Sequence, residues 1–131
     1  MSSAKRPLSP HLLIYKHQAT SSFSILHRIC GVAMTFGTIL FAYWFTSAAY
    51  GPEAFETAQS IMGSWFGLLV LFGFTFSFFF HLATGIRYIC WDMVLGFDME
   101  VATRNAAVIT LFALSMTALT WYVGCSRMGD L

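Results

Sequence analysis

His81 is the residue whose type and surroundings most clearly predict chemistry in this chain. It follows three phenylalanines, Phe78–Phe80, inside a run that carries no Asp, Glu, Lys or Arg between Glu56 and Arg87. An ionisable side chain within so apolar a segment is costly to maintain and by default indicates a function. The question that the sequence raises is what the imidazole binds.

The face of the helix that carries His81 is lined by small residues. Spacings of three and four place Gly73, Ser77, His81, Gly85 and Tyr88 on that face. Such a stripe lets a flat, bulky group approach one imidazole. A haem fits, because its iron takes one axial ligand from each side, whereas no His or carboxylate lies near His81 at a zinc-site spacing. Alternatively, His81 donates a hydrogen bond across a helix interface and the small residues serve helix packing; this helix alone leaves both readings open.

A second polar cluster, Ser24, His27 and Arg28, begins an earlier apolar segment. Ser24 and Arg28 lie one helical turn apart, and their hydroxyl and guanidinium could hydrogen-bond a quinone carbonyl and stabilise the charge that develops on reduction. A haem bound at His81 could direct its propionates toward His27 and Arg28. The alternative for Arg28 is an anchor that extends to the lipid headgroups.

Three long apolar segments must position these residues. Hydrophobic residues make up 57% of the 131 residues and aromatic residues 18%, while charged residues make up 10%, against about 25% in soluble domains. No charged residue lies in the gaps that follow Arg28, Glu56 and Arg104. Each gap is long enough for a helix to cross the bilayer core. We therefore predict an all-α membrane protein with three transmembrane helices, at about 24–49, 61–88 and 105–124, in one domain spanning 1–131.

The charges predict the orientation of these helices. Six of the seven cations flank one side, and only Arg127 flanks the other. The positive-inside rule then places the N-terminus and the loop 89–103 on the inner side, and the loop 51–60 outside. The N-terminal segment lacks the pattern of a cleavable signal, and Pro7 and Pro10 predict that residues 1–20 run along the inner surface. A net charge of +1 gives no indication of nucleic-acid binding. Three helices enclose a bundle poorly, so we expect a partner membrane chain.

Three ordered motifs resemble a known family. RPLSPHLLIY (Arg6–Tyr15), SILHRICG (Ser24–Gly31) and HLATGIRYICWD (His81–Asp92) are similar in order and spacing to the signature blocks of the succinate dehydrogenase cytochrome b556 subunits. The resemblance spans most of the chain. One departure is Tyr88, since many members of the family have histidine there.

The resemblance implies roles for particular residues. Ser24 and Arg28 would contribute to the ubiquinone pocket, His27 would lie near a haem propionate, and His81 would be an axial ligand of haem b. The second axial ligand would come from a companion anchor subunit. The departure at Tyr88 removes a competing ligand and leaves that position without an assigned role. Asp92 could relay protons or contact a partner, although a solvated loop carboxylate is the simpler reading.

The resemblance also implies a place in a larger assembly. A flavoprotein subunit would oxidise succinate, an iron–sulfur subunit would carry the electrons, and ubiquinone would be reduced beside the two anchor subunits. This chain would not be an enzyme alone. Its expected location is a bacterial inner membrane, ahead of the mitochondrial inner membrane. The alternatives are an anchor for a fumarate-reducing complex and a non-redox structural or transporter subunit.

The cation asymmetry yields a prediction about topology. A reporter fused after Leu131 should report the outer side, and reporters at the N-terminus and within 92–103 should report the inner side, because six of the seven cations lie within or beside those two segments. Each site is tested with two reporters, one that is active only in the cytoplasm and one that is active only outside it. An inner location for the fusion at Leu131 would contradict the three-span count or the orientation.

Overall fold

The protein is a set of long helices. The computed structural model describes residues 19–96 and 98–129, and within these ranges it has four helices and no strand. They are α1 (Ala19–Tyr50), α2 (Pro52–Gly63), α3 (Trp65–Asp92) and α4 (Met99–Gly129). Three segments are long and apolar enough to cross a membrane, Ser21–Tyr50, Trp65–Asp92 and Glu100–Arg127. The prediction of an all-α chain with three spanning helices is confirmed. Of residues 1–20, predicted to run along the inner surface, 19 and 20 belong to α1, which begins before the predicted start at about 24, and 1–18 lie outside the described residues.

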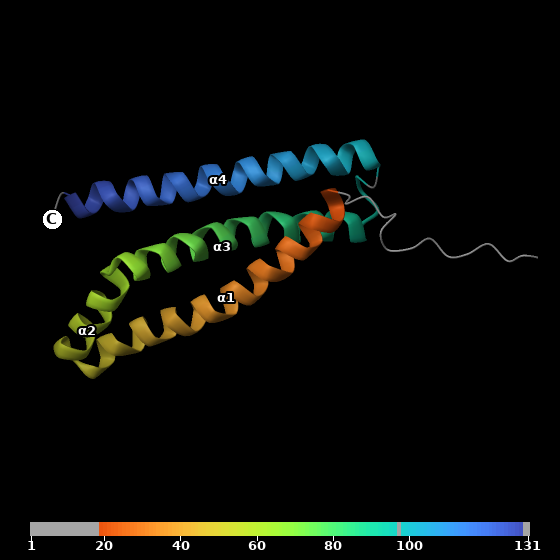
Figure 1. The fold of residues 1–131 in the computed structure, drawn as a ribbon. Helices are drawn as coiled ribbons and strands as arrows, with labels where there is room; N and C mark the ends of the chain where they lie inside the picture. Colours follow the sequence, from red (N-terminus) through yellow and green to blue (C-terminus); the bar gives the residue numbers. More distant parts are fainter. Residues whose placement is uncertain (1–18, 97, 130–131) are drawn as a thin grey trace, which may run out of the picture.

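Helix α3 is the centre of the arrangement. It lies between α1 and α4 and packs against both (Figure 1). Helices α1 and α3 converge at the end where α1 begins, and they separate toward the other end, where α2 spans the gap (Figure 1). The end at which α1 and α4 begin and α3 finishes is called the inner end below. Large apolar side chains remain exposed along all three spanning helices, as a lipid-facing or partner-facing surface requires.

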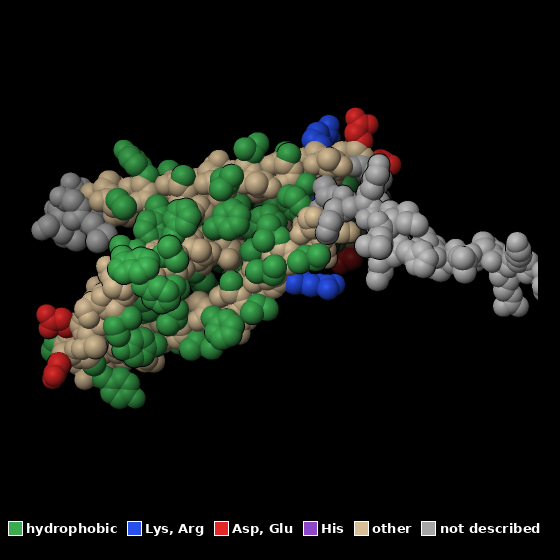
Figure 2. All heavy atoms as spheres, in the orientation of Figure 1, with side chains coloured by type: hydrophobic (Ala, Val, Ile, Leu, Met, Phe, Trp, Pro, Cys, Tyr) green, Lys and Arg blue, Asp and Glu red, His purple; other side chains and the backbone are tan. Residues whose placement is uncertain are grey.

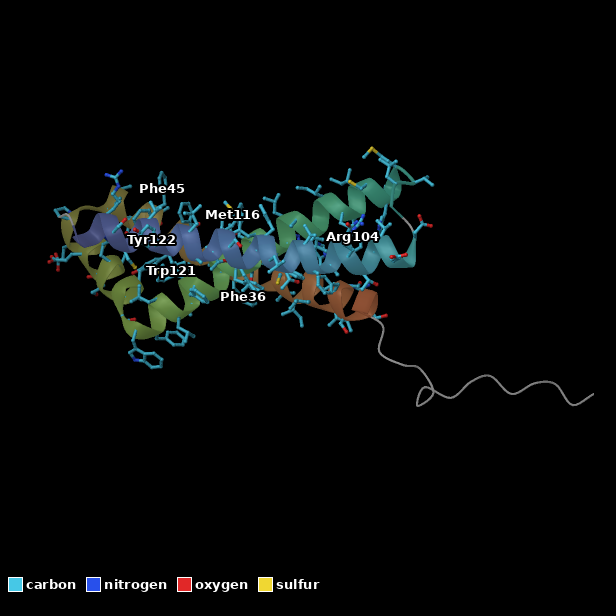
Figure 3. All side chains as sticks on the ribbon, turned by 90° about the horizontal axis from the view of Figure 1, so that it is seen from above. Phe36, Phe45, Arg104, Met116, Trp121 and Tyr122 are labelled. Carbon is cyan, nitrogen blue, oxygen red and sulfur yellow. The ribbon has the colours of Figure 1, made fainter. Side chains whose placement is uncertain are left out.

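Charged side chains gather at the two ends of the helices. The visible face in Figure 2 is apolar over its middle, with both Arg and acidic side chains at the inner end and acidic side chains at the opposite one. Figure 3 shows Arg104 near the start of α4, and Trp121 and Tyr122 toward its other end. Aromatic residues of this kind favour the membrane–water interface. The charge distribution therefore agrees with helices that cross a bilayer.

Helix α2 corrects the predicted loop at 51–60. Gly51 has a φ of 117°, in a region open mainly to glycine, so the chain turns sharply there. Pro52 then occupies the first turn of α2, where its missing N–H costs nothing. The side chain of Ser64 accepts a hydrogen bond from the Gly67 N–H at 3.1 Å and starts α3. The second spanning helix consequently begins at Trp65, four residues after the predicted start at about residue 61.

The inner connection between α3 and α4 is also shorter than predicted. Helix α3 continues to Asp92, and α4 begins at Met99, whereas the sequence predicted a loop over 89–103. The connection contains Val94 with a φ of 61° and Gly96 with a φ of 75°. Two residues in the left-handed region reverse the chain within a few positions. The extra helical turns extend both helices beyond the apolar segments at this end.

Small side chains allow the three spanning helices to pack closely. The core cluster joins Cys30 of α1, Phe80 of α3, and Ile109 and Ala113 of α4. The buried hydroxyl of Thr117 bonds back to its own helix, donating to the carbonyl of Ala113 at 2.7 Å. Cys30 is buried in this cluster as a small, largely apolar side chain.

Gly37 marks a close contact between α1 and α3. It is buried, and a Cβ added there would overlap the ring of Phe74. A Cβ at Gly73 would meet nothing within 4 Å. Small residues at such crossings let two helix backbones approach, which is a main source of helix association in lipid.

The two glycines therefore predict opposite effects. Gly37→Ala should lower the free energy of unfolding by about 1–3 kcal/mol, because the Phe74 ring must move out of its packed position. Gly73→Ala is the matched control and should be neutral or stabilising by up to about 1 kcal/mol, since alanine favours a helix over glycine. Thermal unfolding of the two variants in the same detergent measures this. Equal stability of both variants would show that the α1–α3 contact at Gly37 is not tight.

Candidate functional site at the inner end of α1 and α3

The structure brings together two histidines that the sequence singled out separately. His27 of α1 and His81 of α3 stack face to face, with ring centroids 4.0 Å apart and an angle of 8° between the planes. They are 54 residues apart in the chain. The convergence of α1 and α3 at the inner end is what makes the contact possible (Figure 1).

A hydrogen bond to the backbone orients His81. Its Nδ1 lies 3.1 Å from the carbonyl oxygen of His27. A carbonyl can only accept, so this bond places the proton on Nδ1 and leaves the lone pair on Nε2. Among the described residues Nε2 has no hydrogen-bond partner, and it is not one of the side-chain atoms enclosed within the chain. A metal-binding histidine typically shows this arrangement, in which one nitrogen is fixed and the other is open.

Gly31 allows His81 to lie this close to α1. A Cβ added at Gly31 would be 3.1 Å from Cε1 of His81, which is tighter than ordinary contacts between side chains. Any other residue would push the imidazole away from the His27 carbonyl. Gly31 was noted in the sequence only as part of a motif, and its role depends on the crossing of two helices.

Ser24 and Arg28 lie on the same inner part of α1 but do not contact each other by any hydrogen bond that the structure shows. Ser24 is half-buried and Arg28 is exposed. Neither side chain has a hydrogen bond or ion pair with the described residues. Their donors are therefore available to a group from outside this chain, and their proximity to a quinone stays a prediction.

Arg87 is a residue that the sequence reading missed. It was counted as a charge at the membrane surface, yet its side chain is only 5% exposed. Its guanidinium lies over three aromatic rings, with the central carbon 4.7 Å from the centroid of Trp91, 5.4 Å from Phe23 and 5.5 Å from Tyr88. The signal that could have found it is periodicity, because Phe80, Thr84 and Arg87 follow one buried stripe of α3.

The buried polar atoms without a partner gather in this one region. Within the described part of the chain they are Nε2 of His27, Oγ1 of Thr84 and all three side-chain nitrogens of Arg87. Burying a charge costs several kcal/mol. A desolvated cation–π contact returns about 2 kcal/mol, but it does not satisfy the five N–H donors of a guanidinium. The arrangement favours an acceptor, best an anion, supplied by another molecule.

Tyr88 links the two parts of the site. Its ring meets that of His27 edge-on, with centroids 5.1 Å apart, and it also lies beside the guanidinium of Arg87. Asp92 is exposed at the end of α3. The structure therefore gives Tyr88 a place in the cluster but gives Asp92 no contact that assigns a role.

Comparisons with known proteins place the chain in a family. The sequence model of the family described as "Succinate dehydrogenase/Fumarate reductase transmembrane subunit" matches residues 2–120. The chain belongs to this family. The resemblance carried by the three motifs is thereby confirmed, and the chain is a membrane subunit of this family and not itself the catalytic subunit.

Individual members of the family are similar over nearly the whole chain. The succinate dehydrogenase cytochrome b556 subunit of Rickettsia bellii is 35% identical over 117 residues, which cover 89% of this chain and 91% of the relative. The cytochrome b556 subunit of Paracoccus denitrificans is 32% identical over 118 residues, covering 90% and 91%. The cytochrome b560 subunit of Marchantia polymorpha is 34% identical over 121 residues, covering 87% and 86%.

Proposed function

We propose that this chain is the haem-b-binding membrane anchor of a succinate dehydrogenase, with His81 as one axial ligand of the haem iron. The observation that carries the proposal is the state of His81. Its Nδ1 is held by the His27 carbonyl, and its Nε2 is left open at the surface of the chain. The cytochrome names of the relatives support the same reading.

The residues around His81 fit a haem in three respects. One imidazole is enough, since the companion anchor subunit would supply the second ligand. Gly85, one turn from His81, has open space where a Cβ would be, so a flat group from outside this chain can approach the helix there. The buried Nε2 of His27 lacks an acceptor that a propionate would provide. When bound, haem b accepts and donates single electrons; His81 would hold it, and His27 and Arg28 would orient its carboxylates.

Ser24 and Arg28 are proposed to bind ubiquinone. The Ser24 hydroxyl and the Arg28 guanidinium would donate hydrogen bonds to a quinone oxygen and stabilise its negative charge as electrons arrive. Complete reduction of the quinone takes two electrons and two protons. The donors belong to the inner end of α1, where an electron-donating subunit could dock, and they have no partner among the described residues.

The proposed assembly contains a second membrane anchor, an iron–sulfur subunit and a flavoprotein, in a bacterial inner membrane. The relatives quoted above are named for succinate dehydrogenase, which favours succinate oxidation over the fumarate-reducing alternative. A non-redox structural or transporter subunit is the remaining alternative. The absorption spectrum of the purified complex tests this alternative. A succinate-oxidising or fumarate-reducing anchor would show a reduced b-type haem band, whereas a non-redox subunit would not.

The stacked histidines allow a sharp test of the iron ligand. His81→Ala should abolish or strongly alter the haem spectrum, because it removes Nε2. His27→Ala is the matched control, and it should keep a bis-histidine spectrum because the acceptor for His81 Nδ1 is the backbone carbonyl of residue 27. Absorption and electron paramagnetic resonance spectra of both assembled complexes provide the measurement. An unchanged spectrum in His81→Ala, with loss in His27→Ala, would reverse the assignment.

The quinone role predicts a change in the ratio of two activities. Ser24→Ala and Arg28→Lys should lower succinate-driven quinone reduction by roughly ten- to hundred-fold, since each removes a hydrogen bond to a charged species. Lysine keeps the charge but lacks the planar pair of donors. Succinate oxidation by an artificial acceptor that bypasses the membrane should stay nearly intact.

Arg104→Lys is the control for this experiment, because Arg104 is exposed on α4 at the same end and has no role in the proposal. It should leave both activities unchanged. If Ser24→Ala and Arg28→Lys also keep the wild-type ratio, these residues are structural and the quinone site is built from others.

A further inference from the structure

We infer that Arg87 binds a propionate of the haem and so forms, with His27, the carboxylate-binding part of this site. The inference rests on the proposed function and goes beyond it, since Arg87 lies within the HLATGIRYICWD motif but has no role among the proposed ligands. Arg87 is 95% buried, as its exposed fraction of 5% gives, and none of its nitrogens has a partner within residues 19–96 and 98–129.

The side chains around Arg87 stabilise its positive charge but provide no negative charge to pair with it. Phe23, Tyr88 and Trp91 present ring faces to the guanidinium, and no carboxylate of the described residues pairs with it. Ring faces stabilise the positive charge while leaving the N–H donors unsatisfied. A buried guanidinium in this state requires an acceptor, and a planar carboxylate matches its fork of donors best.

The position of Arg87 favours haem as the source of that carboxylate. Arg87 follows His81 by six residues on α3, or ~9 Å along the axis toward the inner end. The Tyr88 ring lies against both the Arg87 guanidinium and the His27 imidazole, so the two unpaired donor groups share one neighbour. A group held at His81 with its acidic edge toward the inner surface would meet both. A carboxylate of a partner subunit is the competing source.

Haem b and its dimethyl ester distinguish these sources, because the ester has the same iron and ring but no carboxylate. The complex is purified from cells starved of haem and titrated with each compound. Wild type should bind haem b about ten- to hundred-fold more tightly than the ester, as expected for a lost hydrogen bond to a charged group. Arg87→Met should bind the two compounds within about threefold of each other, while the His81 spectrum persists. Arg104→Met loses the same charge at an exposed site of the same end and should keep the wild-type preference.

Stability provides a second readout that a purely structural role would not produce. If a haem propionate is the anion that pairs with Arg87, the unpaired charge of Arg87 destabilises the haem-free complex. Arg87→Met should then leave the unfolding temperature of the haem-free complex unchanged or raise it, and should lower that of the haem-loaded complex.

Two results would overturn the inference while leaving His81 as the ligand. One is a wild-type preference for haem b in Arg87→Met. The other is loss of assembly or stability of Arg87→Met in the absence of haem, which would assign the carboxylate to a partner subunit or give Arg87 a packing role. A wild-type complex that shows no haem band with either compound would instead overturn the proposed function, and this inference with it.

Discussion

The close approach of α1 and α3 is the constraint on which the rest of the structure depends. In lipid, apolar side chains gain little by leaving the bilayer for one another, so helix contacts rely on small residues and on hydrogen bonds. Gly37 admits the ring of Phe74, and Gly31 admits the imidazole of His81. Two such contacts on one pair of helices fix both the rotation and the height of α3 relative to α1. The stacking of His27 on His81 follows from that packing.

The chain treats its polar side chains in two ways. Most hydroxyls bond to a carbonyl three or four residues earlier in their own helix, as Thr75 and Thr110 do, and so make no demand on other molecules. At the inner end, the buried nitrogens of His27 and Arg87 have no such local solution. Unsatisfied polarity is therefore concentrated where the open Nε2 of His81 also lies, and this is the part of the surface from which a polar ligand would gain most.

The sequence predicts the spanning helices because the length of each uncharged segment gives the length of the helix that can cross the bilayer. It also predicts that Ser24, His27 and Arg28 share one end, because spacing within one helix is local information. It could not predict α2, since Gly51 and Pro52 end one helix and equally well begin another. The burial of Arg87 depends on Phe23 of a different helix, and the His27–His81 stack depends on how two glycines meet the opposite helix. Such features arise only when the helices cross.

Helix α2 has a mechanical consequence. At the end opposite the inner end, it joins the diverging α1 and α3 into a triangle. There Trp44 donates a 2.8 Å hydrogen bond to Gln59, and the last turn of α2 packs on Gly67 of α3. A bilayer that becomes thinner or thicker forces spanning helices to change their tilt. A braced pair must tilt as one body, because the angle between α1 and α3 cannot change without breaking those contacts. Variation in membrane thickness would therefore reorient the two histidines together while preserving the distance between them.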